Sequence, residues 1–152
     1  MRIEQPARAS HRYTQRLEAP PERVFPLLCP VREVEWAEGW NPTLVLSGSG
    51  VAEPGCVFTT AEDGREAIWT FTDYDPSGLM VRFVKVVPAL YLLAAEIRLE
   101  AAGAGRSRAH VAYTYTALSR EGEEFVAERS AEWWEAFMRD WEDSLNAYLS
   151  RS

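Results

Sequence analysis

The chain has 152 residues, long enough to bury one hydrophobic core but too short for two, so we expect a single domain spanning 1–152. Its 16 basic and 23 acidic residues give a net charge of -7, which argues against nucleic acid as a partner because phosphate backbones are held by clustered Lys and Arg. No apolar run approaches the roughly 18 residues of a membrane span, and residues 1–19 lack the apolar core of a signal peptide. We therefore expect a cytoplasmic protein with no integral membrane segment.

Cysteine and histidine are scarce. Cys29 and Cys56 are too few for a disulfide framework, and with only His11 and His110 beside them they are too few for a zinc site. We expect both thiols to be reduced and buried, and we expect neither a metal nor a cofactor.

The first third of the chain predicts one strand and two short helices. Ser10–Glu18 alternates polar and apolar residues and stops at Pro20-Pro21. Proline suits a first helical turn because its missing N–H would be unpaired there, so a short helix is expected over 21–28 and a second over 31–37. From residue 41 the period changes to alternation between Gly, Pro, Asp and Ser turns, which predicts an antiparallel meander. Its six strands are expected over 43–47, 57–61, 66–74, 79–87, 91–100 and 108–118.

The C-terminal run from Ser119 to Ser150 predicts one long amphipathic helix. At helical spacing its apolar residues fall within an arc of about 160°, with Trp141 near the centre. At ~1.5 Å per residue this helix would be about 45 Å long, whereas a domain of this size is about 40 Å across. The helix must therefore cross the whole domain.

The ratio of sheet to helix predicts a cavity. Seven strands ~4.8 Å apart form a sheet about 30 Å wide, whereas one helix is about 10 Å across. The sheet would stay exposed unless it curled around the helix, and the space inside such a bend is a natural place for a pocket. The expected fold is therefore α+β, with order β-α-α-β6-α: a seven-stranded antiparallel curved sheet wrapped around a long C-terminal helix.

This order of elements, together with Ala19–Phe25 (APPERVF) and Trp69–Pro76 (WTFTDYDP), resembles the START/Bet v 1-like superfamily (SRPBCC) of helix-grip proteins. Leu28–Trp40 (LCPVREVEWAEGW) and Val111–Ser119 (VAYTYTALS) are similar to its bacterial polyketide cyclase/lipid-transport-like branch. The resemblance covers residues 10–150. It implies a cavity that binds apolar or aromatic small molecules such as lipids, sterols and polyketides. It supplies no universal catalytic motif, since only some members are enzymes.

Aromatic residues are the main functional signal, with six Trp, six Tyr and six Phe. Any one of them is most simply a core residue. A set on converging elements also suits a site that stacks on a planar ligand, because Trp and Tyr add a polar group to a large apolar ring. The candidate lining residues are Trp36, Trp40, Trp69, Phe71, Phe83, Tyr113, Tyr115, Trp134, Phe137, Met138 and Trp141.

Few residues are candidates for proton transfer. In the charged and aromatic segment 32–40, an ion pair between Arg32 and Glu35 is the simpler interpretation. If Glu35 or Glu33 instead points inward, burial raises its pKa and makes it a usable general acid or base. Tyr113 and His11 are the other candidates, although no nucleophilic triad can be identified around them.

The leading hypothesis is a protein, monomeric or weakly homodimeric, that binds a hydrophobic or aromatic small molecule without a cofactor. One alternative is a cofactor-independent cyclase or dehydratase that uses Tyr113, Glu35 or His11. Another is an interaction module of the co-chaperone type, in which the cavity is only residual core. A pocket with several polar tips favours an enzyme, apolar walls favour a carrier, and a filled core with an exposed apolar patch favours the interaction module.

Overall fold

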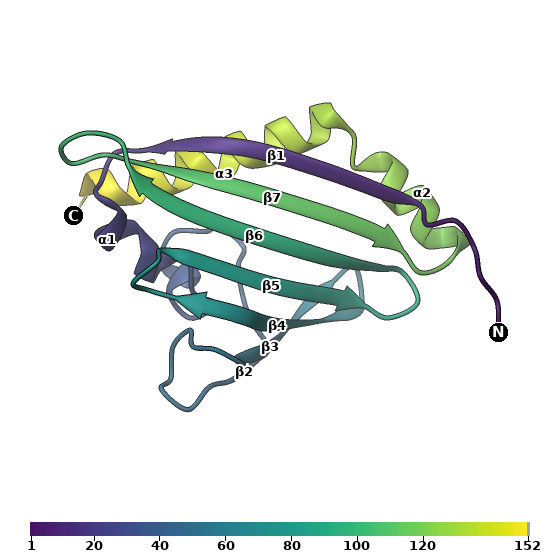
Figure 1. The fold of residues 1–152 in the computed structure, drawn as a ribbon. Coiled ribbons are helices and arrows are strands. Elements are labelled where there is room, and N and C mark those ends of the chain that lie inside the picture. Colours follow the sequence, from purple (N-terminus) through teal and green to yellow (C-terminus); the bar gives the residue numbers. More distant parts are fainter. Residues whose placement is uncertain (152) are drawn as a thin grey trace.

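The computed structural model describes residues 1–151 and shows one curved antiparallel sheet with a long C-terminal helix along it (Figure 1). The fold class expected from the sequence is confirmed. None of the helices within residues 1–151 has both the length and the apolar character that a membrane crossing needs. The strands are β1 (Arg8–Leu17), β2 (Leu44–Leu46), β3 (Val57–Glu62), β4 (Arg65–Asp75), β5 (Met80–Val87), β6 (Tyr91–Ala101) and β7 (Ser107–Ala117). The helices are α1 (Pro21–Val24), α2 (Arg120–Glu128) and α3 (Ala131–Arg151), with 3₁₀ turns η1 (Phe25–Leu27) and η2 (Arg32–Glu35).

The sheet has the order β1-β7-β6-β5-β4-β3-β2, and every neighbouring pair is antiparallel. Strands β2 to β7 form the predicted meander, and β1 lies beside β7 at one edge. Each strand begins and ends within two residues of the bounds predicted from the sequence. The register of β4 against β5 shifts between Phe71 and Asp73, and such a bulge bends the strand in which it lies.

The side of the sheet that faces α3 carries the core. On β6, Leu93, Ala95, Ile97 and Leu99 are buried, whereas Arg98 and Glu100, in the alternate positions, are exposed, as the alternation predicts. β7 follows the same rule, with Val111, Tyr113 and Tyr115 buried and His110 exposed. Residues two apart on a strand therefore point into the space between sheet and helix.

The prediction of one continuous C-terminal helix over 119–150 is wrong, because the segment forms two helices. Helix α2 ends at Glu128, and α3 begins at Ala131. The backbone of Arg129 leaves the helical region, with ψ at 60°. Its carbonyl accepts a 2.7 Å hydrogen bond from His11 Nε2. The Ser130 hydroxyl accepts a 3.1 Å hydrogen bond from the Trp133 N–H and so caps the start of α3. Both helices turn an apolar face to the same sheet, so the periodicity did not reveal the break. The 21 residues of α3 span about 32 Å rather than the predicted 45 Å.

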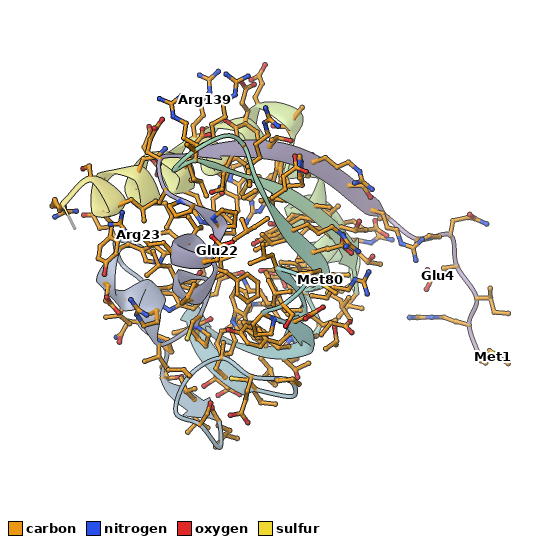
Figure 2. All side chains as sticks on the ribbon, turned by 60° about the vertical axis from the view of Figure 1, so that its left-hand side comes forward. Met1, Glu4, Glu22, Arg23, Met80 and Arg139 are labelled. Carbon is orange, nitrogen blue, oxygen red and sulfur yellow. The ribbon has the colours of Figure 1, made fainter. Side chains whose placement is uncertain are left out.

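The two short helices are shorter than predicted. The segment expected as helix over 21–28 is α1 followed by the 3₁₀ turn η1, and the segment expected over 31–37 holds only the 3₁₀ turn η2. Arg23 of α1 donates a 2.9 Å hydrogen bond to the Leu149 carbonyl, and Figure 2 shows Arg23 beside the last turns of α3. This bond ties the first helix to the end of the last one.

Helix α3 is hydrogen-bonded to the free edge of β1. Trp134 donates to the Arg12 carbonyl at 3.0 Å, and Glu142 accepts from the Arg16 N–H at 2.5 Å. Asn146 makes two bonds at 2.9 Å, donating to the Arg16 carbonyl and accepting from the Glu18 N–H. The β1 groups involved all belong to alternate residues, because an antiparallel edge strand turns every second residue's backbone outward. Side chains of α3 thus take the place of a further strand.

Substitution of Asn146 tests this attachment. Asn146→Ala removes two hydrogen bonds to the backbone of β1, so we expect the free energy of unfolding to fall by about 1–2 kcal/mol. Urea denaturation followed by circular dichroism measures the change. Asp143→Ala, at an exposed position of the same helix, is the control and should change stability by less than about 0.5 kcal/mol. Equal losses in both variants would contradict the role of Asn146.

Candidate ligand-binding site

A pocket of about 280 Å³, here called the aromatic pocket, lies between the sheet, η2 and α3. Its volume shows that aromatic side chains leave room inside the bend of the sheet. Its polar lining groups are few and its walls consist mainly of rings. The lining residues are Leu28, Glu33, Trp36, Ala37, Glu38, Trp40, Phe58, Trp69, Phe71, Val81, Phe83, Ile97, Tyr113, Phe137, Asp140, Trp141 and Ser144.

Two periodicities position these side chains. Strand residues two apart share a face, which brings the inward residues of β3 to β7 to one wall. On α3 the lining residues Phe137, Asp140, Trp141 and Ser144 are three or four apart and share one side of the helix. The opposing walls therefore follow directly from the strand and helix repeats.

Hydrogen bonds hold three of the four tryptophans by their edges. Trp36 donates its indole N–H to the Leu27 carbonyl at 3.0 Å, and Trp40 donates to the Pro30 carbonyl at 2.8 Å. Trp69 donates to the Thr60 hydroxyl at 3.0 Å. The Trp141 N–H is buried without an acceptor among the described residues. Because these edge groups are engaged by the protein, the indoles are left to present ring surface to the pocket.

The rings also orient one another. Trp36 of the loop after η2 stacks on Trp141 of α3 with centroids 6.2 Å apart, which links the two sides of the pocket. Phe58 stacks on Trp69 at 5.2 Å, and Trp40 meets Trp69 edge to face at 5.5 Å. Offset and edge-to-face contacts of this kind add to the stability gained from burial alone.

Glu33 is the least exposed of the three acidic residues that line the aromatic pocket. Its carboxyl has no hydrogen-bond or ion-pair partner in the described part of the chain, and burial raises its pKa to about 8. Glu33 is half-buried and lines the pocket. Tyr113 is 5% exposed, and burial, with Tyr115 and Glu33 nearby, raises its pKa well above the usual value. At neutral pH both groups are therefore mostly protonated.

The inward orientation considered for Glu35 is wrong. Arg32 and Glu35 are three apart in a 3₁₀ turn, where such residues lie directly above one another. Arg32 Nε lies 2.5 Å from a Glu35 oxygen, and the Tyr148 hydroxyl donates to the other oxygen at 2.6 Å. These hydrogen bonds, that of Arg32 first, lower the pKa of Glu35. Glu35 is thus the partner in an exposed ion pair, and Glu33 is the glutamate of the pocket.

Three other candidates, His11, Trp134 and Met138, line neither the aromatic pocket nor the second pocket described below. His11 stacks on Trp134 at 5.3 Å and donates to the Arg129 carbonyl, while Met138 is fully buried near Gln15. Trp134 and Met138 are four apart on the side of α3 that faces β1, so they pack against that strand instead of the pocket. Of the predicted lining set, the aromatic pocket brings together Trp36, Trp40, Trp69, Phe71, Phe83, Tyr113, Phe137 and Trp141.

A second pocket of about 300 Å³ shares Trp40, Trp69, Tyr113 and Phe137 with the first, and Tyr115 lines this one. It contains an ion pair that the sequence analysis missed. Lys85 Nζ lies 2.5 Å from a carboxylate oxygen of Glu62, and the Tyr91 hydroxyl donates to the other oxygen at 2.6 Å. Lys85 also lies 4.6 Å from the centroid of the Trp69 ring.

Burial is the largest influence on the pKa of both charged groups. It lowers the pKa of Lys85 in spite of Glu62. For Glu62, burial is outweighed by the attraction and hydrogen bond of Lys85 and by the bond from Tyr91, so the net pKa is lowered. A sequence signal for the pair did exist, because Lys85 falls in the inward phase of β5 with Val81, Phe83 and Val87.

Ligands for a metal are not gathered in one place. No group of three or more His, Cys, Asp or Glu side chains in residues 1–151 is arranged to hold an ion. Cys29 and Cys56 are free and buried, as expected from the sequence.

The sequence matches no family model and no curated protein. Solved structures match it over most of its length. Norcoclaurine synthase from Thalictrum flavum, in complex with dopamine and hydroxybenzaldehyde, superposes with a TM-score of 0.68 at 11% identity, over 96% of this chain and 88% of that one. Ara h 8.0201 gives 0.66 at 15% identity, over 95% and 99%. The fold is the Bet v 1-like helix grip.

An aromatase/cyclase shares this helix-grip fold. Zhui aromatase/cyclase from Streptomyces sp. R1128 matches with a TM-score of 0.59 at 18% identity, over 95% of this chain and 93% of that one. At such identities the likeness concerns the fold. The helix grip found here is therefore an architecture that accommodates small molecules in the norcoclaurine synthase complex.

The pKa of Glu33 predicts how stability depends on pH. Between pH 4.5, its ordinary value, and about 8, folded Glu33 keeps a proton that the unfolded chain has released, so this group makes the protein less stable as pH rises through that window. Glu33→Gln removes the effect. We expect its melting temperature relative to the wild type to increase from pH 5 to pH 9, as measured by calorimetry.

Glu35→Gln is the matched control for that measurement. The pKa of Glu35 is lowered, so its carboxylate stabilises the folded state at and above its ordinary pKa, and the contribution is lost in acid. The Gln variant should therefore lose stability at pH 7 relative to the wild type and lose less at low pH. A Glu33→Gln difference that stays constant with pH would contradict the buried, unpaired state of Glu33.

Proposed function

We propose that the protein binds a hydrophobic, aromatic small molecule in the aromatic pocket. The observation that carries this proposal is a space of about 280 Å³ walled by Phe and Trp rings, with three of the four Trp N–H groups hydrogen-bonded within the protein. Such a site offers large apolar area and stacking surface with few fixed polar groups, which is typical of small-molecule pockets. We place the protein in the cytoplasm, as a monomer or weak homodimer.

The structural neighbours support a small aromatic guest. The norcoclaurine synthase complex contains dopamine and hydroxybenzaldehyde, and the Streptomyces protein is an aromatase/cyclase. The interaction-module alternative required a filled core, and the two pockets argue against it. Leu44 and Leu46 are exposed apolar residues on the short edge strand β2, and they line neither pocket. The exposed patch that the interaction module needs is therefore present, but the filled core is not.

A second candidate is a cofactor-independent enzyme that moves a proton. It is favoured by one observation, the unpaired carboxyl of Glu33 in the same pocket as the Tyr113 hydroxyl. With a pKa of about 8, Glu33 is close to the working pH at which a general base is most effective. Its carboxylate could remove a proton next to a carbonyl, and the Tyr113 hydroxyl could donate a hydrogen bond to the oxygen.

A ring substitution tests the binding proposal. Trp69→Leu removes a wall of the pocket, so its affinity for the neutral naphthalene fluorophore prodan should fall about five- to tenfold, corresponding to about 1–1.4 kcal/mol for a lost aromatic contact. Phe125→Leu removes an aromatic ring on α2 that lines neither pocket, and it should leave the affinity near that of the wild type. Fluorescence titration, with circular dichroism to verify folding, decides; equal affinities in all three proteins would count against the aromatic pocket.

Proton exchange tests the enzyme candidate. In D₂O at pH 8 the wild type should accelerate exchange of the α-protons of β-tetralone, an aromatic ketone, by about 100-fold through Glu33, a gain typical of a positioned base. Glu33→Gln should lose this acceleration, and Glu35→Gln should retain it. The measurement is one-dimensional proton NMR over time. If Glu33→Gln exchanges as fast as the wild type, Glu33 is not a base for this chemistry.

A further inference from the structure

The aromatic pocket has charge of one sign only. Glu33, Glu38 and Asp140 line it, and the described lining residues include no Lys, Arg or His. Arg32, next to Glu33 in the chain, pairs with Glu35 on the surface, and Lys85 of β5 pairs with Glu62 in the second pocket. Glu38 and Asp140 are exposed, whereas Glu33 is the inner group. A negatively charged guest would be repelled by Glu38 and Asp140, whereas a positively charged one would be attracted to them and to Glu33 once its carboxyl ionises.

The rings add to this preference. The faces of Trp and Tyr rings are negative, and a cation within about 6 Å of the ring centroid is attracted to them. Trp36, Trp40 and Trp69 are fixed by their N–H groups, so their rings line the pocket in set orientations. The protein makes such a contact itself, since Lys85 lies 4.6 Å from the Trp69 centroid. Aromatic walls beside a carboxylate are the chemistry that recognises ammonium groups.

Three polar groups that line the pocket lack partners within the described chain: the buried Trp141 N–H, the Tyr113 hydroxyl and the carboxyl of half-buried Glu33. Tyr113 is 5% exposed and its hydroxyl makes no hydrogen bond, and the Glu33 carboxyl has neither a hydrogen bond nor a counter-charge. A buried polar group without a partner destabilises the fold, and a buried charge does so more strongly. A guest that supplies positive charge to Glu33 and an N–H or O–H group to Tyr113 would remove this cost.

We propose that the aromatic pocket takes an organic cation, a protonated amine or quaternary ammonium group on an apolar or aromatic body, with the positive group beside Glu33. The inference rests on the proposed binding function and names the class of its ligand. The body of the ligand stacks on the rings of β3 to β5, and the cationic group lies among Glu33, Trp36 and Trp141.

This ligand class couples binding to pH. Positive charge beside Glu33 favours the carboxylate over the acid, so the complex releases the proton that free Glu33 holds below pH 8. The affinity for a permanent cation should therefore rise with pH up to about 8 and then level off. The other titratable groups facing Glu33 are Tyr113 on β7, Glu38 after η2 and Asp140 on α3; β3 to β6 contribute only uncharged side chains to the pocket.

A pair of isosteric probes tests the proposal. Phenyltrimethylammonium and tert-butylbenzene have the same shape and differ only in the charged atom. At pH 9 the cation should bind at least about tenfold more tightly than the hydrocarbon, because it gains the ring faces and the Glu33 carboxylate. From pH 9 to pH 6 its affinity should fall about tenfold or more, while that of tert-butylbenzene stays constant. Ligand-observed NMR titration measures both.

Two variants assign the effect. In Glu33→Gln the affinity for phenyltrimethylammonium should become independent of pH between 6 and 9, which separates Glu33 from Glu38 and Asp140. Glu35→Gln, two positions away in the surface ion pair, should behave as the wild type. If tert-butylbenzene binds as tightly as the cation at pH 9, or if the pH dependence survives in Glu33→Gln, the cation proposal is overturned and the binding proposal stands. If neither probe binds, both are overturned.

Discussion

The hydrogen bonds between α3 and the free edge of β1 set the geometry of the whole protein. An unpaired edge strand exposes backbone groups with which another chain can pair, and here Trp134, Glu142 and Asn146 bond the outward groups of Arg12, Arg16 and Glu18. The bonds also hold α3 to one side of the sheet, near β1 and β7, while β2 to β4 lie toward the opposite edge (Figure 1). The sheet must bend to enclose the helix, and the space left between α3 and the far strands becomes the aromatic pocket.

The interior of the bend is divided by electrostatics as well as by shape. In the aromatic pocket the carboxyl of Glu33 is unpaired, and burial keeps it largely protonated near neutral pH. In the second pocket the carboxylate of Glu62 is matched by Lys85 and by the Tyr91 hydroxyl. Two half-buried glutamates within one fold therefore differ in protonation because only Glu62 is paired with a cation.

The alternation of apolar and polar residues along the strands was the most reliable sequence pattern for predicting which side chains face the interior. It placed Ile97, Tyr113 and Tyr115 on the inner face because the repeat of two is fixed by the pleat. It was less informative in the loop after β1, where the choice between Glu33 and Glu35 depends on whether a four-residue turn winds as an α-helix or as a 3₁₀ helix. Both windings fit the same residues, so the sequence left both glutamates open. The position of Trp134 depended in turn on which edge of the sheet α3 contacts, and that is a long-range property.

The shared wall of the two pockets has a consequence for how this protein can change. The two pockets share the side chains of Trp40, Trp69, Tyr113 and Phe137. On one side is the aromatic pocket with the unpaired Glu33, and on the other is the second pocket with the Lys85–Glu62 ion pair. Phe137 is the one member of this partition that projects from the helix instead of the sheet or the loop after η2, so shortening it would disturb neither strand pairing nor the indole anchors. One substitution of Phe137 by a smaller residue would join the two pockets. Variants of this chain would then accept larger ligands while keeping the same fold.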